Sequence, residues 1–236
     1  MIDIHCHILP GIDDGPAHLD ESVEMAGIAS CDGITTIVAT PHVKDDLYPA
    51  RVIREGVDRL NERIAALGIP LVVVTGADVN ALVDPSLLGD YTINGTGYIL
   101  LEFPHTHIPQ NARDILFRVM AAGLRPIITH PERNLAVIRN PDLLLELSRG
   151  DSLIQITAAS LTGDMGPDVR ECASYLLRKD VVSVIATDAH SSVRRRPVLS
   201  EGLRVAEGII GRERASRLVG ANPEAVLQGR PVDETE

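Results

Sequence analysis

The chain has 236 residues, and its 33 acidic and 22 basic side chains give a formal net charge of −11. This charge disfavours nucleic acid and anionic membranes as partners, and no apolar run approaches the roughly 20 residues of a membrane span. Apolar residues make up 44% and charged residues 23%, a balance typical of a folded globular protein. The start of the chain lacks the features of a signal peptide, and the three cysteines form no CxxC pair. We therefore expect a cytoplasmic protein with reduced thiols.

Short apolar runs alternate with amphipathic stretches along the chain. The apolar runs predict strands at Ile2–His5, Thr35–Thr40, Leu71–Gly76, Tyr98–Phe103, Pro126–His130, Leu153–Thr157 and Val182–Thr187. The amphipathic stretches predict helices at Leu19–Ser30, Arg51–Leu67, Asn111–Ala122, Pro141–Arg149, Asp168–Lys179, Pro197–Gly211 and Glu213–Val219. This alternation indicates a single α/β domain over residues 1–236 with a parallel sheet, and we expect a poorly ordered tail from about residue 224. The pattern alone does not distinguish a closed barrel from an open sheet.

Histidine or a carboxylate stands at the C-terminal end of six of the seven predicted strands. In chain order these strand ends carry His5-Cys6-His7, Thr40-Pro41-His42, Gly76-Ala77-Asp78, Glu102, His130-Pro131-Glu132-Arg133 and Asp188-Ala189-His190. One histidine at a strand end is usually a hydrogen-bonded core residue. In a barrel of parallel strands, however, these ends meet at one rim, where active sites form. Six polar ends at one rim predict a functional site.

The pair His5 and His7 is the strongest local signal, because residues i and i+2 of a strand point to the same face. Two imidazoles there could bind one metal ion, although a buried strand with polar ends would show the same pattern. Asp188 and His190 repeat this spacing. Glu102 lies in an apolar run, where an unpaired carboxylate is costly and requires a cation or a proton. The number of imidazoles and carboxylates predicts two or three divalent ions, as in clusters that catalyse displacement at phosphorus.

Two further segments could contribute to this rim. The loop 9–16 turns back over it, and we expect Asp14 rather than Asp13 to enter the site, with a plain surface turn as the alternative. Arg133 and one member of Arg194–Arg196 could clamp phosphoryl oxygens, although a run of arginines is more often a solvated face.

A second H-x-H pair, His105 and His107, lies in a loop flanked by prolines and not on a strand. We interpret this segment as a substrate loop or as exposed histidines, in preference to a metal site.

The longer strings around these residues resemble a known family. DIHCHILPGIDDGP, TPH, LLEFP, ITHPERN, QITAASLTG and TDAH followed by RRRP are similar, in this order from residue 1 to about residue 223, to bacterial capsule-type tyrosine phosphatases of the PHP (polymerase and histidinol phosphatase) superfamily. The resemblance implies a distorted (β/α)7 TIM-like barrel with a cluster of two or three divalent ions, commonly manganese, with iron or zinc as alternatives. It also implies cytoplasmic dephosphorylation of the tyrosine-rich tail of a tyrosine autokinase in exopolysaccharide synthesis.

The resemblance further implies how ligands and arginines are used. One ion would be bound by His5, His7, Asp78 and Asp188; a second by Asp78, Glu102 and His130; and a third by Asp14 or its neighbour, His42, Glu102 and His190. Arg133 and Arg195 match the phosphate-binding arginines of the family. Two positions differ from the family pattern. Cys6 stands where the family usually has serine, and Asp78, one methylene shorter, stands where it usually has glutamate.

We interpret the chain as a metal-dependent phosphomonoesterase that hydrolyses protein phosphotyrosine by attack of a metal-bound hydroxide. A histidinol-phosphate or other small-molecule phosphatase on the same fold is the alternative. The loop 9–16 and the string PERN disfavour histidinol phosphate as the substrate. The net charge disfavours a PHP-type nuclease. A non-catalytic, metal-binding partner of the kinase is disfavoured because each expected ligand position carries a capable residue. Cys6 must point away from the face that His5 and His7 share, so we do not expect a cysteine nucleophile.

Overall fold

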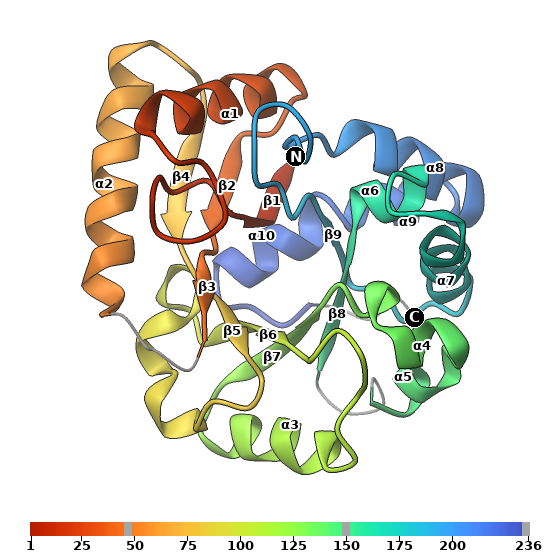
Figure 1. The fold of residues 1–236 in the computed structure, drawn as a ribbon. Coiled ribbons are helices and arrows are strands. Elements are labelled where there is room, and N and C mark those ends of the chain that lie inside the picture. Colours follow the sequence, from red (N-terminus) through yellow and green to blue (C-terminus); the bar gives the residue numbers. More distant parts are fainter. Residues whose placement is uncertain (45–48, 148–151, 233–236) are drawn as a thin grey trace.

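The structure is a computed structural model that describes residues 1–44, 49–147 and 152–232. Within these ranges all strand pairs are parallel and form two sheets, with the orders β1-β2-β4 and β3-β5-β6-β7-β8-β9 (Figure 1). The strands are β1 (Ile2–Cys6), β2 (Thr36–Ala39), β3 (His42–Val43), β4 (Val72–Thr75), β5 (Asp78–Asn80), β6 (Tyr98–Glu102), β7 (Arg125–Thr129), β8 (Leu153–Thr157) and β9 (Val184–Ala186).

The two sheets are connected by strands that bend from one into the other. Only residues 40–41 separate β2 from β3, and only residues 76–77 separate β4 from β5. Gly76 permits the second bend, because a Cβ at this position would lie 2.5 Å from Cγ1 of Val38 on the neighbouring strand. The predicted strands Thr35–Thr40 and Leu71–Gly76 correspond to β2 and β4 alone. The sequence did not predict their continuations β3 and β5 beyond each bend.

The first strand also meets the last. The amide of Asp188 donates to the carbonyl of His5, and the amide of His7 donates to the carbonyl of Ala189, both at 2.8 Å. The buried carboxylate of Asp3 adds to this junction, since it accepts hydrogen bonds from the backbone N–H and the hydroxyl of Thr187. These contacts join β1 to the segment after β9, and the parallel strands alternating with helices confirm the predicted α/β class.

The helices of the described residues surround the strands, with α10 behind them near the centre of the view (Figure 1). They are α1 (Leu19–Cys31), α2 (Ala50–Ala66), α3 (Ala112–Ala121), α4 (Leu135–Arg139), α5 (Asp142–Leu147), α6 (Ala158–Thr162), α7 (Pro167–Arg178), α8 (Ser200–Ile210), α9 (Arg212–Arg217) and α10 (Ala221–Leu227). Short 3-10 turns add η1 (Pro85–Leu87), η2 (Gly89–Tyr91), η3 (Ile93–Gly95) and η4 (Pro131–Arg133). None of these helices is long and apolar enough to cross a membrane.

Two apolar cores lie on the two faces of the barrel strands. The larger one fills the space between the strands and the outer helices. The smaller, inner core contains Ile4, Val38, Ile93, Tyr98, Leu100, Ile127, Val184, Ala186 and Val226. Because side chains alternate along a strand, Glu102 follows Tyr98 and Leu100 on the inner face of β6. Polar side chains at the strand ends therefore lie above the inner core, at the mouth of the barrel.

A β-bulge in β1 determines which of its side chains face the mouth of the barrel. Between Asp3 and Cys6, three residues of β1 advance against two residues of β2. Ile4 packs in the inner core, whereas Cys6, two residues later, packs in the outer core. The bulge thus reverses the alternation, so that Ile4 and the next residue, His5, both point into the barrel.

Some boundaries differ from the sequence prediction. The sequence predicts a poorly ordered tail from about residue 224. In the structure residue 224 lies inside α10, and Val226 of this helix is buried in the inner core. Residues 233–236 lie outside the described ranges, as do residues 148–149 of the predicted helix 141–149. The short helices α4, α6 and α10 were not predicted.

Helix α8 provides a matched test of this packing. A Cβ on Gly202 would lie 2.7 Å from Cα and Cβ of Ala158 in α6, whereas a Cβ on Gly208 would meet nothing within 4 Å. We expect Gly202→Leu to lower the free energy of unfolding by about 2 kcal/mol and the Tm by roughly 4–8 °C. Gly208→Leu should leave the Tm unchanged or higher, because leucine favours the helix. Equal thermal unfolding curves for the two variants would contradict this packing of α8 on α6.

Candidate metal centre

The residues expected to bind metal lie together at the mouth of the barrel. Their ligand atoms form four groups, and within each group all atoms lie within 4.8 Å of one another. The groups are His7, Asp14, His42 and His190; His5, His130 and Asp188; His5, His7 and Asp78; and His42, Asp78 and Glu102. Every expected ligand belongs to at least one group, and we refer to these nine residues as the candidate ligands. Four of them belong to two groups, so the four groups form one connected cluster.

Three imidazoles are oriented by bonds at Nδ1. Nδ1 of His5 lies 2.9 Å from Oε1 of Gln155 on β8, and Nδ1 of His7 lies 2.6 Å from Oδ2 of Asp13. Nδ1 of His190 lies 3.0 Å from the carbonyl oxygen of Asp188. Since each of these oxygens accepts a hydrogen bond from the Nδ1–H group, Nε2 of each ring is left to bind an ion.

The two Nε2 atoms of His5 and His7 are only 3.2 Å apart. With both Nδ1 atoms protonated, both Nε2 atoms are acceptors and cannot hydrogen-bond to each other. Two facing acceptors require a shared cation. Without a metal, a proton on His7 can take the place of this cation. Burial lowers the pKa of His7, but Asp13 and Asp188 outweigh burial and raise it to about 10. A divalent ion would replace that proton, so the donor set fits a metal cluster.

Burial keeps other candidate ligands in the protonation state that metal binding needs. It lowers the pKa of His130 to about 3 and that of His190 to about 4, so both imidazoles are neutral. Burial also disfavours the charged form of Asp78, but the nearby histidines outweigh it and hold its pKa well below its usual range. Glu102 is different, because burial and the charge of Asp78 raise its pKa to about 7.

Two candidate ligands have a strained backbone. His130 and Asp188 adopt positive φ angles of 31° and 51°, a region that residues other than glycine rarely occupy. Such conformations cost on the order of 1–3 kcal/mol each and cluster at functional sites. They turn the chain sharply after β7 and β9 and direct both side chains into the mouth.

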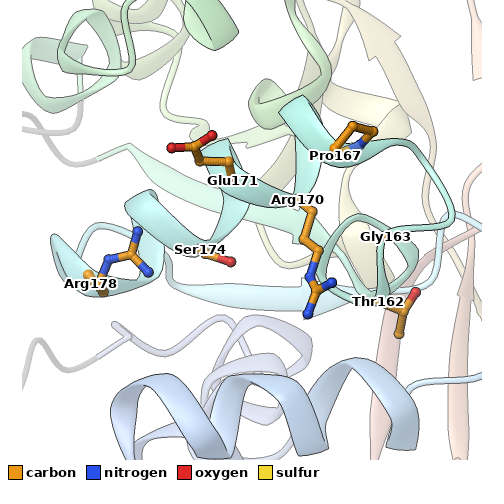
Figure 2. A pocket seen from close by; sticks show the side chains of 7 residues that line it. All are labelled: Thr162, Gly163, Pro167, Arg170, Glu171, Ser174 and Arg178. Atoms are coloured by element: carbon orange, nitrogen blue, oxygen red, sulfur yellow. The ribbon is translucent and has the colours of Figure 1, made fainter.

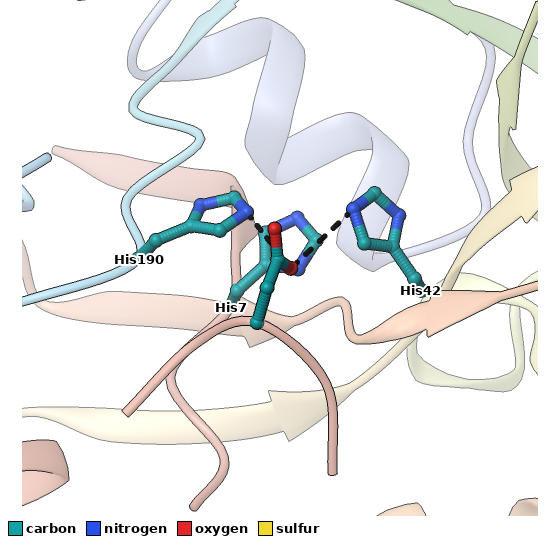
Figure 3. Close-up of side chains that lie close together, drawn as sticks. His7, His42 and His190 are labelled. Carbon is teal, nitrogen blue, oxygen red and sulfur yellow. Dashed lines mark ion pairs between the residues drawn. The ribbon is translucent and has the colours of Figure 1, made fainter. Parts of the chain in front are cut away.

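The two aspartates of the loop after β1 have different roles. The carboxylate of Asp13 is occupied, since it accepts hydrogen bonds from His7 and from the backbone N–H groups of Gly15 and His42. Oδ1 of Asp14 lies 3.3 Å from Nε2 of His190, and its side chain is 65% exposed. Figure 3 shows His7, His42 and His190 around one carboxylate. The geometry favours Asp14 as a ligand, as the sequence predicts, and assigns Asp13 an orienting contact.

Both expected arginines reach the same carboxylate. Arg133 in η4 and Arg195 in the loop after β9 each donate to Oδ2 of Asp188. Oδ1 of Asp188 lies 3.4 Å from Nε2 of His5 and from Nε2 of His7. Both guanidinium groups are partly exposed, so their other N–H groups can reach an anion at the mouth. Arg194 and Arg196 are exposed, which leaves Arg195 as the member of the triplet beside the cluster.

Comparison with known proteins agrees with this geometry. Residues 1–228 match the family described as capsular polysaccharide synthesis, CpsB/CapC. The chain belongs to the CpsB/CapC family. Tyrosine-protein phosphatase YwqE of Bacillus subtilis (strain 168) is 38% identical over 242 residues, covering 98% of this chain and 93% of YwqE. The predicted family resemblance is confirmed.

Solved structures give the same result. The chain superimposes with a TM-score of 0.93 and 36% identity on a structure described as YwqE from Bacillus subtilis and CpsB from Streptococcus pneumoniae, unique metal-dependent tyrosine phosphatases. This match covers 100% of the chain and 97% of the other protein. A dihydropyrimidinase from Brevibacillus agri NCHU1002 has a TM-score of 0.60 at 11% identity, over 98% of this chain and 71% of that protein. The second likeness shows the fold alone.

Two other features of this CpsB/CapC protein lie outside the candidate cluster. Cys6 is buried in the outer core, as predicted, and burial raises the pKa of its thiol well above the usual value. A pocket of about 500 Å³ lies on α6 and α7 (Figure 2). It is lined by Thr162, Gly163, Pro167, Arg170, Glu171, Ser174 and Arg178. Since none of these is a candidate ligand, the pocket is separate from the candidate metal centre.

Sequence reasoning did not assign a supporting role to three residues. Gln155 and Asp13 orient His5 and His7, and Glu132 is fully buried. Oε1 of Glu132 accepts hydrogen bonds from the backbone N–H of Thr157 and the hydroxyl of Ser160, and so joins η4 to the end of β8. The alternation along Leu153–Thr157 could have placed Gln155 on the inner face, but no local pattern names its partner.

Gln155 gives a direct test of the orienting contacts. We expect Gln155→Leu to weaken metal binding by about 10–100-fold, because His5 loses the acceptor that fixes its ring. The free energy of unfolding should fall by only about 1–3 kcal/mol, for the buried Nδ1–H of His5 that loses its acceptor. Nε2 of Gln155 adds nothing to this cost, because it already lacks a hydrogen-bond partner. Metal affinity can be measured by competition with a chelating dye. Gln228→Leu, at the end of α10, is the matched control. Unchanged affinity in Gln155→Leu would show that this contact does not support the cluster.

Proposed function

We propose that this CpsB/CapC-family protein is a metal-dependent phosphomonoesterase that hydrolyses phosphotyrosine in proteins. The observation that carries the proposal is the overlap of four groups of ligand atoms beside two arginines at the mouth of one barrel. The description of YwqE and CpsB as metal-dependent tyrosine phosphatases supports it.

The nine candidate ligands would hold two or three divalent ions. A mixture of imidazole and carboxylate donors suits manganese, iron and zinc, and we propose manganese as the resident metal. Bound there, the ions would neutralise phosphoryl oxygens and make a water molecule acidic enough to act as the nucleophile.

The side chains of the chain itself bind and orient the substrate. Arg133 and Arg195 would bind equatorial phosphoryl oxygens through the N–H groups not used by Asp188, and their charge would stabilise the transition state. Asp188 holds both guanidinium groups at one position, so neither loses much side-chain freedom when the substrate binds. The leaving phenolate has a parent pKa near 10 and needs less protonation than an alkoxide would.

The proposed substrate is the phosphorylated tail of a bacterial tyrosine autokinase of exopolysaccharide synthesis, with both proteins in the cytoplasm. The description of the family as capsular polysaccharide synthesis supports this context. The mouth also suits a side chain presented by a polypeptide, because Asp14 and both arginines are at least partly exposed. Three free cysteines fit a reducing compartment.

Hydrolysis of a phosphotyrosine peptide tests the activity and its metal dependence together. The purified protein should contain more than one divalent ion per chain, and chelation should lower kcat/KM by about 100-fold or more. Manganese should restore the rate. Cys6→Ala should retain activity, because a thiol buried in the outer core is neither accessible nor ionised. Faster hydrolysis of histidinol phosphate than of the peptide would favour a small-molecule phosphatase, and metal-free activity would contradict the proposal.

Asp78 is the candidate ligand at which the chain differs from the family pattern, so variants of this residue test the cluster. Its carboxylate belongs to two ligand groups and lies 3.8 Å from Nε2 of His5. We expect Asp78→Ala to lose bound metal and to lower kcat by about 100-fold or more. Asp78→Glu should keep both, because the longer side chain can reach the same ions. Full metal content and full rate in Asp78→Ala would exclude Asp78 as a ligand.

A further inference from the structure

His105 lies at the mouth of the barrel but belongs to none of the four ligand groups of the described residues. Its Nε2 is 3.4 Å from Oε1 of Glu102, and its side chain is 61% exposed. The most exposed histidine among the candidate ligands, His42, is only 16% exposed. His105 therefore contacts the cluster from outside, with most of its ring facing solvent.

The position of His105 is fixed by its backbone. Its carbonyl oxygen accepts a hydrogen bond from the amide of Leu135 at 2.9 Å, and the carbonyl oxygen of Pro104 accepts one from the side chain of Asn134 at 2.7 Å. Leu135 and Asn134 directly follow Arg133. The loop that carries His105 is thus attached to the segment that carries a phosphate-binding candidate.

The ring of His105 also has a fixed orientation. It lies nearly parallel to the ring of His130, with an interplanar angle of 16° and a centroid separation of 5.9 Å. One side of the imidazole is therefore directed toward the cluster, and the remainder is exposed to solvent at the mouth.

An aryl phosphate has to be recognised with few aromatic side chains. The chain contains no tryptophan, two phenylalanines and four tyrosines, and Tyr48 lies outside the described ranges. The described members are buried or lie on helices: Tyr91, Tyr98 and Phe103 are buried, Phe117 is on α3 and Tyr175 is on α7. Among the described residues, each candidate ligand that packs against another ring packs against a histidine. Of the histidines in these ring pairs, His105 is the one exposed to solvent.

We propose that His105 is a specificity residue whose imidazole packs against the aromatic ring of the phosphorylated side chain. This inference rests on the proposed function. With the phosphoryl group at Arg133 and Arg195, the phenyl ring leaves the cluster beside His105, which selects an aryl ester over an alkyl ester. Offset packing of two rings strengthens binding by about threefold to tenfold.

Two phosphonates that differ only in the ring test this role. Calorimetry on the manganese-loaded protein should show that phenylphosphonate binds more tightly than methylphosphonate. In His105→Ala, the Kd of phenylphosphonate should rise by about threefold to tenfold, whereas the Kd of methylphosphonate should not change. His105→Phe should restore the preference, because it keeps a ring without the nitrogen near Glu102. His107→Ala, two residues along the same loop, is the matched control and should bind both ligands as the unmodified protein does.

Several outcomes would overturn the inference. Equal loss of both phosphonates in His105→Ala, or loss of manganese from this variant, would mean that His105 supports the cluster instead. Failure of His105→Phe to restore the preference would assign the effect to the nitrogen and not to the ring. No phenyl preference in the unmodified protein would exclude ring recognition. If the unmodified protein bound neither phosphonate, the proposed function would itself be wrong, and this inference would fall with it.

Discussion

The bulge in β1 allows one short strand to serve two purposes. Ile4 fills the inner core, and His5 and His7 stand directly above it at the mouth. In a regular strand, Ile4 and His5 would point to opposite faces, and one of these two contributions would be lost. The bulge lies where β1 leaves its register with β2 and meets the segment after β9. The geometry of the whole cluster depends on this local irregularity, because His5 and His7 together take part in three of its four ligand groups.

Charge is balanced around Asp188. This buried carboxylate faces two arginines on one oxygen and two imidazoles on the other. Burial alone would favour its neutral form, but these neighbours hold its pKa well below the usual value. One carboxylate thus connects the part of the mouth suited to cations with the part suited to a phosphoryl group.

Much of this arrangement could be predicted from the sequence, because the relevant signals are local. Apolar runs mark the strands, and a polar residue directly after such a run marks the rim, so the sequence alone could assign His42, Asp78 and His130 to one site. The supporting contacts could not be predicted in this way. The bonds from Gln155 to His5 and from Asp3 to Thr187 join residues about 150 or more positions apart, and nothing in either segment identifies the partner. The bulge could not be predicted either, because strict alternation correctly puts His5 and His7 on one face but wrongly puts Ile4 on the opposite face. Asp13 and Asp14 were hard to separate, since which of two adjacent carboxylates turns inward depends on the backbone of the loop.

The pairing of β1 with the segment after β9 has a consequence for the order in which the protein can fold on the ribosome. The candidate ligands run from His5 to His190, and the inner core beneath them includes Val226 of α10. While the chain is being synthesised, β1 emerges early but cannot pair with the segment after β9 until residues 187–189 have left the exit tunnel. During this interval His5 and His7 have neither Asp188 nor their complete inner core. The metal centre is thus a late product of translation, and the nascent chain must keep its first strand from pairing elsewhere while more than 180 further residues are added.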